Sequence, residues 1–78
     1  MNLAALKRAA AKVGATVEND SSGNWICYQV VAPDGMWWRE SYGPHLAVST
    51  TRGEKSWLAD AIKDGIERIG SGLIEAEE

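Results

Sequence analysis

The 78-residue sequence lacks the cysteine pairs of disulfide-stabilised proteins and the long apolar runs of membrane-spanning proteins. Its single cysteine, Cys27, excludes a disulfide bond within the chain. There is no run of roughly 18 apolar residues, and so the sequence predicts no membrane association. Lys7 and Arg8 lie inside an alternating pattern and do not precede an apolar block, which argues against a signal peptide. We therefore expect a cytoplasmic protein.

Side chains that commonly perform catalysis or bind metals are also scarce. The sequence has one histidine and one cysteine, and no cluster with the spacing of metal ligands. His45 follows Gly43 and Pro44 in an expected loop, where a surface role is more common than a catalytic one. Cys27 lies within an expected strand and fits a small packing residue better than a nucleophile. We therefore expect a protein without enzymatic activity, bound metal or cofactor.

The net charge of −3 is unevenly distributed along the chain. Residues 70–78 contain three glutamates and no base, whereas residues 1–17 contain three bases and no acid. These bases are Lys7, Arg8 and Lys12. An acidic chain lacks the overall attraction that drives nonspecific nucleic-acid binding. The local basic patch nevertheless keeps nucleic acid as an alternative partner.

The first helix is expected at residues 3–13, which are rich in alanine and carry an apolar stripe at helical spacing. Asn2 is a suitable N-terminal cap, and Gly14 falls where a helix would end. The stripe predicts that one side of this helix packs on the rest of the protein.

The second helix is expected at residues 52–69, followed by a tail at residues 70–78. Thr51 and Glu54 have the spacing of a capping box at its start. Gly65 lies within the apolar stripe of this helix. We expect Gly65 to let the helix approach the sheet or the first helix closely.

Three strands are expected between the helices, at residues 15–18, 25–32 and 36–42, because these segments are rich in strand-forming residues. Residues 33–35, with the sequence Pro-Asp-Gly, are typical of a tight turn and predict a hairpin of the last two strands. Residues 45–49 fit either a brief extended segment or a plug at the end of the core.

Successive side chains of a strand point to opposite faces, which divides the predicted hairpin into two sets. In the register set by the turn, Val30 faces Trp38. We expect the nearly uncharged set to face the core: Ile26, Tyr28, Val30, Ala32, Met36, Trp38, Glu40 and Tyr42. The other set mixes two indoles with polar groups: Trp25, Cys27, Gln29, Val31, Trp37, Arg39 and Ser41. Trp57, beside the stripe of the second helix, is also expected in the core.

These elements predict a single domain over residues 1–78 with an α+β fold. The order is α-β-β-β-α, a three-stranded antiparallel meander with both helices packed on one face. The other face would be bare unless a partner, a second subunit or the Leu73–Ile74 segment covers it. This order resembles that of double-stranded-RNA-binding domains, which present a basic cluster at the start of their second helix. Here Arg52 and Lys55 occupy that place, with Glu54 between them.

The predicted bare face suggests a binding surface. Trp25, Gln29, Trp37 and Arg39 would give it an aromatic platform with the composition of a binding hot spot. We therefore expect a non-enzymatic interaction module that binds a protein partner or pairs as a homodimer. A compact chain of this kind resembles the small accessory proteins of phages and mobile elements, which often bind and modulate a host protein. The alternatives are a nucleic-acid-binding domain that uses aromatic stacking and, last, a small enzyme.

Overall fold

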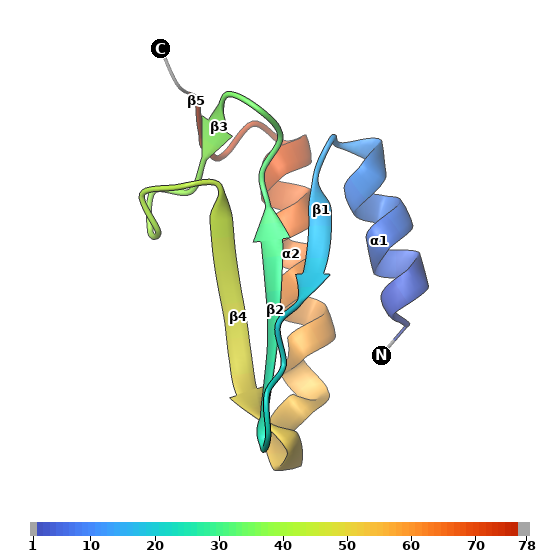
Figure 1. The fold of residues 1–78 in the computed structure, drawn as a ribbon. Coiled ribbons are helices and arrows are strands. Elements are labelled where there is room, and N and C mark those ends of the chain that lie inside the picture. Colours follow the sequence, from blue (N-terminus) through green and yellow to red (C-terminus); the bar gives the residue numbers. More distant parts are fainter. Residues whose placement is uncertain (1, 77–78) are drawn as a thin grey trace.

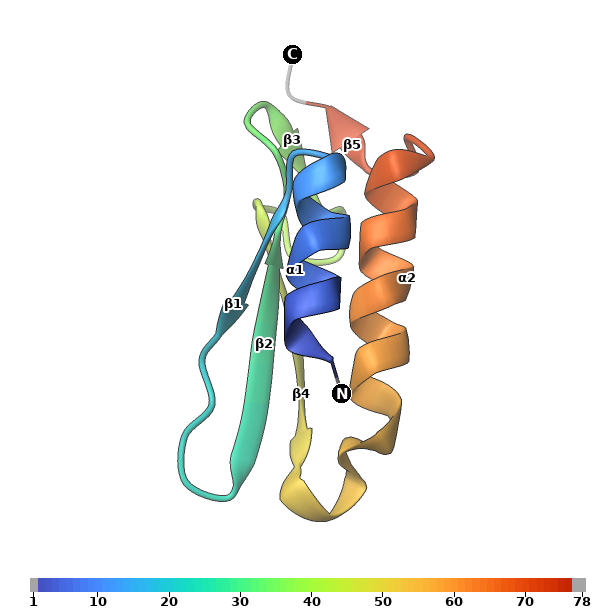
Figure 2. The same cartoon turned by 90° about the vertical axis from the view of Figure 1, so that its right-hand side faces the viewer.

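Two helices pack on one face of an antiparallel sheet in the computed structural model, which describes residues 2–76 (Figures 1 and 2). The elements in chain order are α1 (Leu3–Lys12), β1 (Thr16–Asn19), β2 (Trp25–Val31), β3 (Met36–Trp37), β4 (His45–Thr51), the 3₁₀ helix η1 (Arg52–Trp57), α2 (Leu58–Gly70) and β5 (Glu75–Ala76). The main sheet has the order β1-β2-β4, and β3 pairs with β5 in a second, two-stranded sheet. The α+β class and the arrangement of both helices on one face are as predicted.

Helix α1 lies where the sequence predicts a helix. The Oδ1 atom of Asn2 accepts a hydrogen bond from the Ala5 N–H at 3.1 Å, which satisfies one of the donors left open at a helix start. Gly14 follows the helix with a φ of 77°, a left-handed conformation that glycine adopts without steric cost. The helix packs against β1 and α2 and buries Ala10.

The third strand of the main sheet is β4, and the prediction that residues 36–42 take this place is wrong. The predicted turn does form, because the Met36 N–H donates to the Pro33 carbonyl at 3.0 Å and Gly35 has a φ of 82°. Beyond the turn, only β3 is extended, and it pairs with β5 and not with β2. β2 instead pairs along its whole length with β4. Residues 45–49 are therefore a strand, which was one of their two predicted states.

Trp38 is buried as predicted, although its backbone does not pair with β2. Its side chain is fully buried, and its Nε1–H lies 3.1 Å from the Val30 carbonyl and 3.0 Å from the Pro44 carbonyl. After β3 the chain reverses, because the Trp38 N–H donates to the Gly43 carbonyl and the Tyr42 N–H donates to the Trp38 carbonyl, both at 2.8 Å. The backbone groups of Trp38 are used in this reversal and not in pairing with β2. The predicted pairing of Val30 with Trp38 is consequently replaced by a pairing of Val30 with Leu46.

The core lies between the main sheet and the helices. The even-numbered side chains of β2 face it, as predicted, because Ile26, Tyr28 and Val30 are all buried. They pack with Trp38 and with apolar side chains of α2, which include Leu58 and Ile62. The division of β2 into a core face and an outer face is therefore confirmed.

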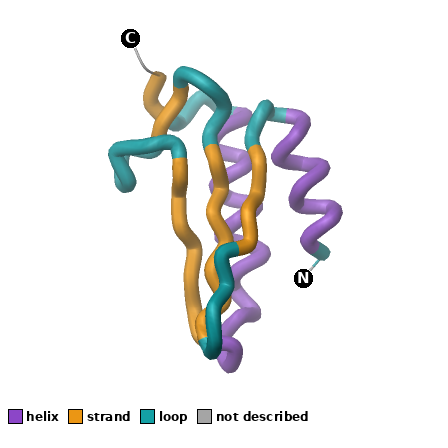
Figure 3. The backbone as a smooth tube through the Cα atoms, viewed as in Figure 1, coloured by secondary structure: helices purple, strands orange, loops and turns teal. Residues whose placement is uncertain are grey.

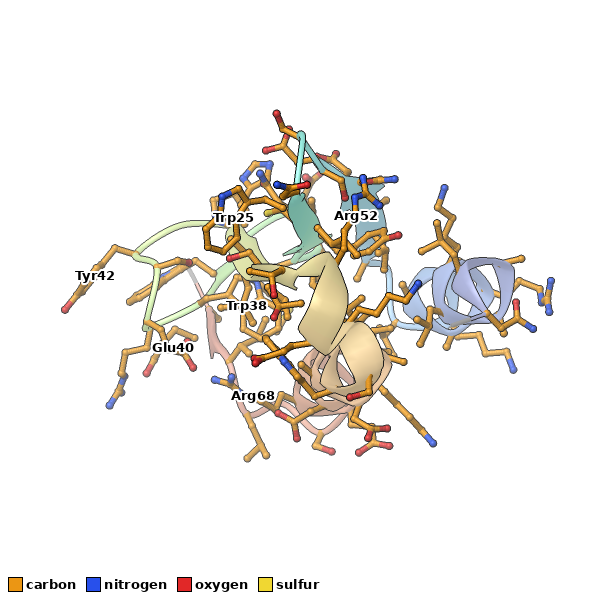
Figure 4. The ribbon with its side chains drawn as sticks, turned by 90° about the horizontal axis from the view of Figure 1, so that it is seen from below. Trp25, Trp38, Glu40, Tyr42, Arg52 and Arg68 are labelled. Carbon is orange, nitrogen blue, oxygen red and sulfur yellow. The ribbon has the colours of Figure 1, made fainter. Side chains whose placement is uncertain are left out.

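Three side chains that were expected in the core lie outside it. Glu40 and Tyr42 belong to the loop between β3 and β4, which projects beyond the outer side of β4 (Figures 3 and 4). Tyr42 is 85% exposed and has a φ of 53°. Trp57 is 43% exposed because it ends η1 before the buried stripe of α2 begins. These predictions failed because they assumed a regular strand and a regular helix where the chain forms a loop and a 3₁₀ turn.

The second helix begins later than predicted, and the capping box does not form. Thr51 makes no capping hydrogen bond with its side chain. Glu54 has φ −126° and ψ 31°, which lies outside the helical range. Every residue of η1 is exposed, so no apolar stripe holds this segment in an α-helix. The regular helix α2 begins at Leu58, where the buried stripe begins.

Gly65 lies at the contact between α2 and the sheet, as predicted. A Cβ atom at this position would lie 3.4 Å from Cη2 of Trp38 and 3.7 Å from Cγ2 of Val30. A Cβ would thus be in ordinary contact with both side chains, whereas a longer side chain would enter the space that the Trp38 indole occupies.

Candidate functional site

The face of the main sheet that points away from the helices is the first candidate surface. None of its side chains is a lysine or an arginine, and its only carboxylate belongs to Glu18. The side chains of this open face are those of Thr16, Glu18, Trp25, Cys27, Gln29, Val31, His45, Ala47, Ser49 and Thr51. The open face is thus nearly uncharged and includes one large aromatic side chain.

Two of the four predicted platform residues lie on the open face. Trp25, the first residue of β2, is 58% exposed and lies opposite Thr51 of β4 (Figure 4). Gln29 lies four residues along the same strand, and its Nε2 donates to Oδ2 of Asp20 at 3.4 Å. Cys27 lies between them as a free, half-buried thiol.

The other two platform residues lie elsewhere. Trp37 belongs to β3, which follows the far end of β2, and a strand of seven residues spans roughly 20 Å. Its ring lies beside that of Tyr42, with 6.4 Å between the centroids. The exposed Arg39 forms an ion pair with Glu75 of β5. The structure therefore does not bring Trp25, Gln29, Trp37 and Arg39 into one platform, because β3 does not pair with β2.

The described part of the C-terminal tail leaves the open face uncovered. Ile74 is buried in the core, whereas Leu73 is 71% exposed. β5 then pairs with β3 at the end of the molecule where β2 finishes (Figures 1 and 2). The Leu73–Ile74 segment, which was considered as a cover, thus contributes one core residue and lies away from the sheet face.

A second candidate surface is the outer edge of β4, which the predicted hairpin did not include. The N–H of Ala32 donates to the Pro44 carbonyl, and the N–H of Arg52 donates to the Asn24 carbonyl. In an antiparallel pair, every second residue exchanges hydrogen bonds with the neighbouring strand. These two bonds and the register of β2 and β4 therefore show that the N–H and C=O groups of even-numbered β4 residues point toward β2. The N–H and C=O groups of His45, Ala47 and Ser49 therefore point outward, and no partner for them is found within residues 2–76.

The sequence contains a signal for this edge. Residues 45–51 alternate between exposed and more buried side chains, with Leu46, Val48 and Thr50 on the core side. The same segment has no lysine, arginine, acid, proline or glycine, which are the residues that commonly interrupt or protect strands. The alternation could have identified the strand, but only the structure shows that its outer side is unpaired.

The remaining polar candidates do not form a reactive cluster. Lys7, Arg8 and Lys12 are exposed on α1, on the helical side of the molecule. His45 is exposed at the start of β4. Glu40 pairs with Arg68, whose guanidinium carbon lies 5.1 Å from the ring centroid of Trp38. A hydrogen bond from its own backbone N–H, together with the bond from Arg68, lowers the pKa of Glu40 below its usual value.

Within the described chain, no three histidine, cysteine or acidic side chains are grouped closely enough to hold a metal ion. Neither α1 nor α2 combines the length and the apolar character of a bilayer-spanning helix, and the rest of residues 2–76 contains no such helix. Comparison of the chain with protein-family models, with curated proteins and with solved structures gives no match.

Proposed function

We propose that this chain is a non-enzymatic interaction module that binds an extended segment of another polypeptide along the outer edge of β4. The main support is that β4 is a seven-residue edge strand without the residues that normally protect such an edge. Exposed edges pair readily with other strands, and proteins usually protect them with lysine, proline, bulges or a covering element. An unprotected edge of this length is suited to binding.

The opposite edge of the same sheet provides a contrast. β1 has only four residues, carries the charged side chain of Glu18, and has α1 packed against it. This edge has three of the features that prevent unwanted pairing. Because one edge of the sheet is protected from pairing and the other is not, this contrast favours a role for the β4 edge in binding another strand.

Strand addition explains how β4 would hold a partner. The outward N–H and C=O groups of His45, Ala47 and Ser49 would form main-chain hydrogen bonds with the added strand. The added strand would extend the open face, and its side chains would lie near those of β4. Trp25, one strand further in, would supply apolar contact area to long side chains of the partner.

The charge of the open face favours a protein over a nucleic acid as the partner. Nucleic-acid binding depends strongly on lysine and arginine contacts to phosphates, and the open face has neither residue. The basic patch of Lys7, Arg8 and Lys12 lies on the helical side and cannot add to this surface. We further propose that the partner is a host protein and that this chain is a cytoplasmic accessory protein of a phage or mobile element. The support for this more specific proposal is the small size and compact single domain of the chain.

Replacement of Ala47 by proline tests the proposal. The Ala47 N–H points outward, and so Ala47→Pro removes a donor from the edge and none from the pairing of β2 with β4. Ala47→Thr is the matched control, because it changes the side chain but keeps the N–H. We expect peptides selected from a displayed random library on the original protein to bind Ala47→Thr and to lose at least roughly tenfold in affinity for Ala47→Pro.

Circular dichroism and light scattering accompany this comparison, so that a folding defect or a change in self-association is recognised. Equal binding of the selected peptides to both folded variants would contradict strand addition. Selected peptides that bind both variants but not Trp25→Ala would place the binding site on the open face alone.

A further inference from the structure

A hollow of about 670 Å³ lies at the end of the molecule where β2 begins, on the core side of the sheet. It is bounded by β2, by the loop between β1 and β2, by η1 and by the first residues of α2. Its size lies within the range of pockets that bind small molecules. It is separate from the open face and from the outer edge of β4.

The charge of the hollow is positive. Arg52 and Lys55 line it, and no carboxylate does, although Glu54 lies between them in the sequence. Neither cation forms an ion pair within residues 2–76. The walls of the hollow therefore include two basic residues and no acidic residue.

Arg52 is held in place by the protein. Its Nε–H donates to the Gly23 carbonyl at 3.1 Å, and its backbone N–H donates to the Asn24 carbonyl at 3.2 Å. The side chain reaches from the start of η1 toward the loop between β1 and β2 (Figure 4). Its two terminal nitrogens make no hydrogen bond to the described part of the chain, and a fixed guanidinium with open donors is suited to an oxyanion.

Tyr28 adds an independent feature. Its ring belongs to the core and the residue is only 9% exposed, but its hydroxyl forms no hydrogen bond within residues 2–76. No buried side-chain oxygen of the described residues lacks a partner, and so this hydroxyl lies at the accessible surface. It lines the same hollow, together with the hydroxyl-bearing residue Ser56 and the apolar side chains of Ile26 and Leu58. Because Tyr28 lines the hollow and its accessible hydroxyl is not used by the protein, it can donate a hydrogen bond to a ligand bound there.

We infer that this hollow binds a small molecule that carries a phosphate monoester. A phosphate dianion matches the two positive charges of Arg52 and Lys55, and its oxygens can accept hydrogen bonds from the guanidinium and from Tyr28. A carboxylate would leave one positive charge unmatched. The apolar surface of Ile26 and Leu58 suits the organic part of the ligand. This binding is independent of strand addition at β4.

An NMR titration of the ¹⁵N-labelled protein tests this site, with inorganic phosphate and phenyl phosphate as ligands at constant ionic strength. We expect the amide signals of Gly53 and Ser56 to shift, and phenyl phosphate to bind more tightly than inorganic phosphate. Lys55→Gln, whose side chain makes no described contact that supports the fold, should weaken phenyl phosphate binding by roughly tenfold. Lys63→Gln is the matched control, because it removes one positive charge from an exposed part of α2 outside the hollow.

Tyr28→Phe separates binding from folding. Because the hydroxyl bonds to no protein group, its removal should leave the thermal midpoint nearly unchanged and still weaken phenyl phosphate binding several-fold. Equal affinity of Lys55→Gln and Lys63→Gln, or shifts confined to residues outside the hollow, would overturn the inference. So would benzoate binding as tightly as phenyl phosphate. Tighter binding of dimethyl phosphate or of a short oligonucleotide would point to a nucleic-acid backbone and would equally reject a monoester site.

Discussion

Two adjacent tryptophans show how strongly single residues determine this fold. Trp38 is fully buried and directs its indole N–H at two backbone carbonyls, whereas Trp37 is half-buried beside Tyr42. Their order in the alternating pattern correctly predicted which of the two is in the core. The pattern did not reveal that Trp38 joins the end of β2 to Pro44, the residue that precedes β4.

Replacement of Trp38 by phenylalanine should therefore lower the free energy of unfolding by about 2–3 kcal/mol, because the core loses volume and the indole hydrogen bonds disappear. The Pro44 carbonyl keeps its bond from Ala32, which limits the loss. Trp37→Phe is the matched change and should cost less than about 1 kcal/mol. Urea unfolding followed by circular dichroism measures both values. A cost for Trp37→Phe equal to that for Trp38→Phe would mean that the environments of the two residues are misassigned.

Elements whose position depends on neighbouring residues in the sequence were easier to predict than elements whose position depends on contacts with distant residues. The cap at Asn2 and the glycine at position 14 define α1 within a few residues of the chain, and its position was predicted correctly. The turn at residues 33–35 is equally local and also forms. Whether the chain after that turn pairs with β2 depends on the chain reversal at residues 38–43 and on competition from β4. Neither can be read from the turn itself.

The packing of α2 on the sheet leads to a prediction at Gly65. Gly65→Ala places a Cβ at ordinary contact distance from Trp38 and removes the helix penalty of glycine, so stability should stay equal or rise by up to about 1 kcal/mol. Gly65→Leu extends into the space of Trp38 and Val30 and should cost about 3 kcal/mol through overpacking. Thermal and urea unfolding compare the two variants. Wild-type stability in Gly65→Leu would show that α2 does not approach the indole.

At the scale of the whole molecule, the candidate site was only partly accessible from the sequence. Alternation within β2 identified Trp25 and Gln29 as outward-facing, which required no knowledge of distant contacts. Trp37 and Arg39 were assigned to the same surface through a hairpin that does not form. The outer edge of β4 was missed because an edge is a property of the assembled sheet, and a strand in isolation does not reveal which neighbours it lacks.

The two proposed sites lie on different parts of the molecule. The edge of β4 and the open face are nearly uncharged, whereas the hollow beside η1 carries two positive charges. A polypeptide and a phosphate-bearing small molecule would therefore bind without competing for the same side chains. Their tests use different variants, so failure of one leaves the other intact.

Amide hydrogen exchange of the dilute monomer, followed by NMR, tests the unpaired edge of β4 most directly. We expect alternating protection along the strand: the amides of Leu46, Val48 and Thr50 exchange slowly, and those of His45, Ala47 and Ser49 exchange rapidly, because only the first group donates to β2. Protection of Ala47 and Ser49 equal to that of Val48 would show that the edge is already covered, and it would contradict the account of β4 as a binding strand.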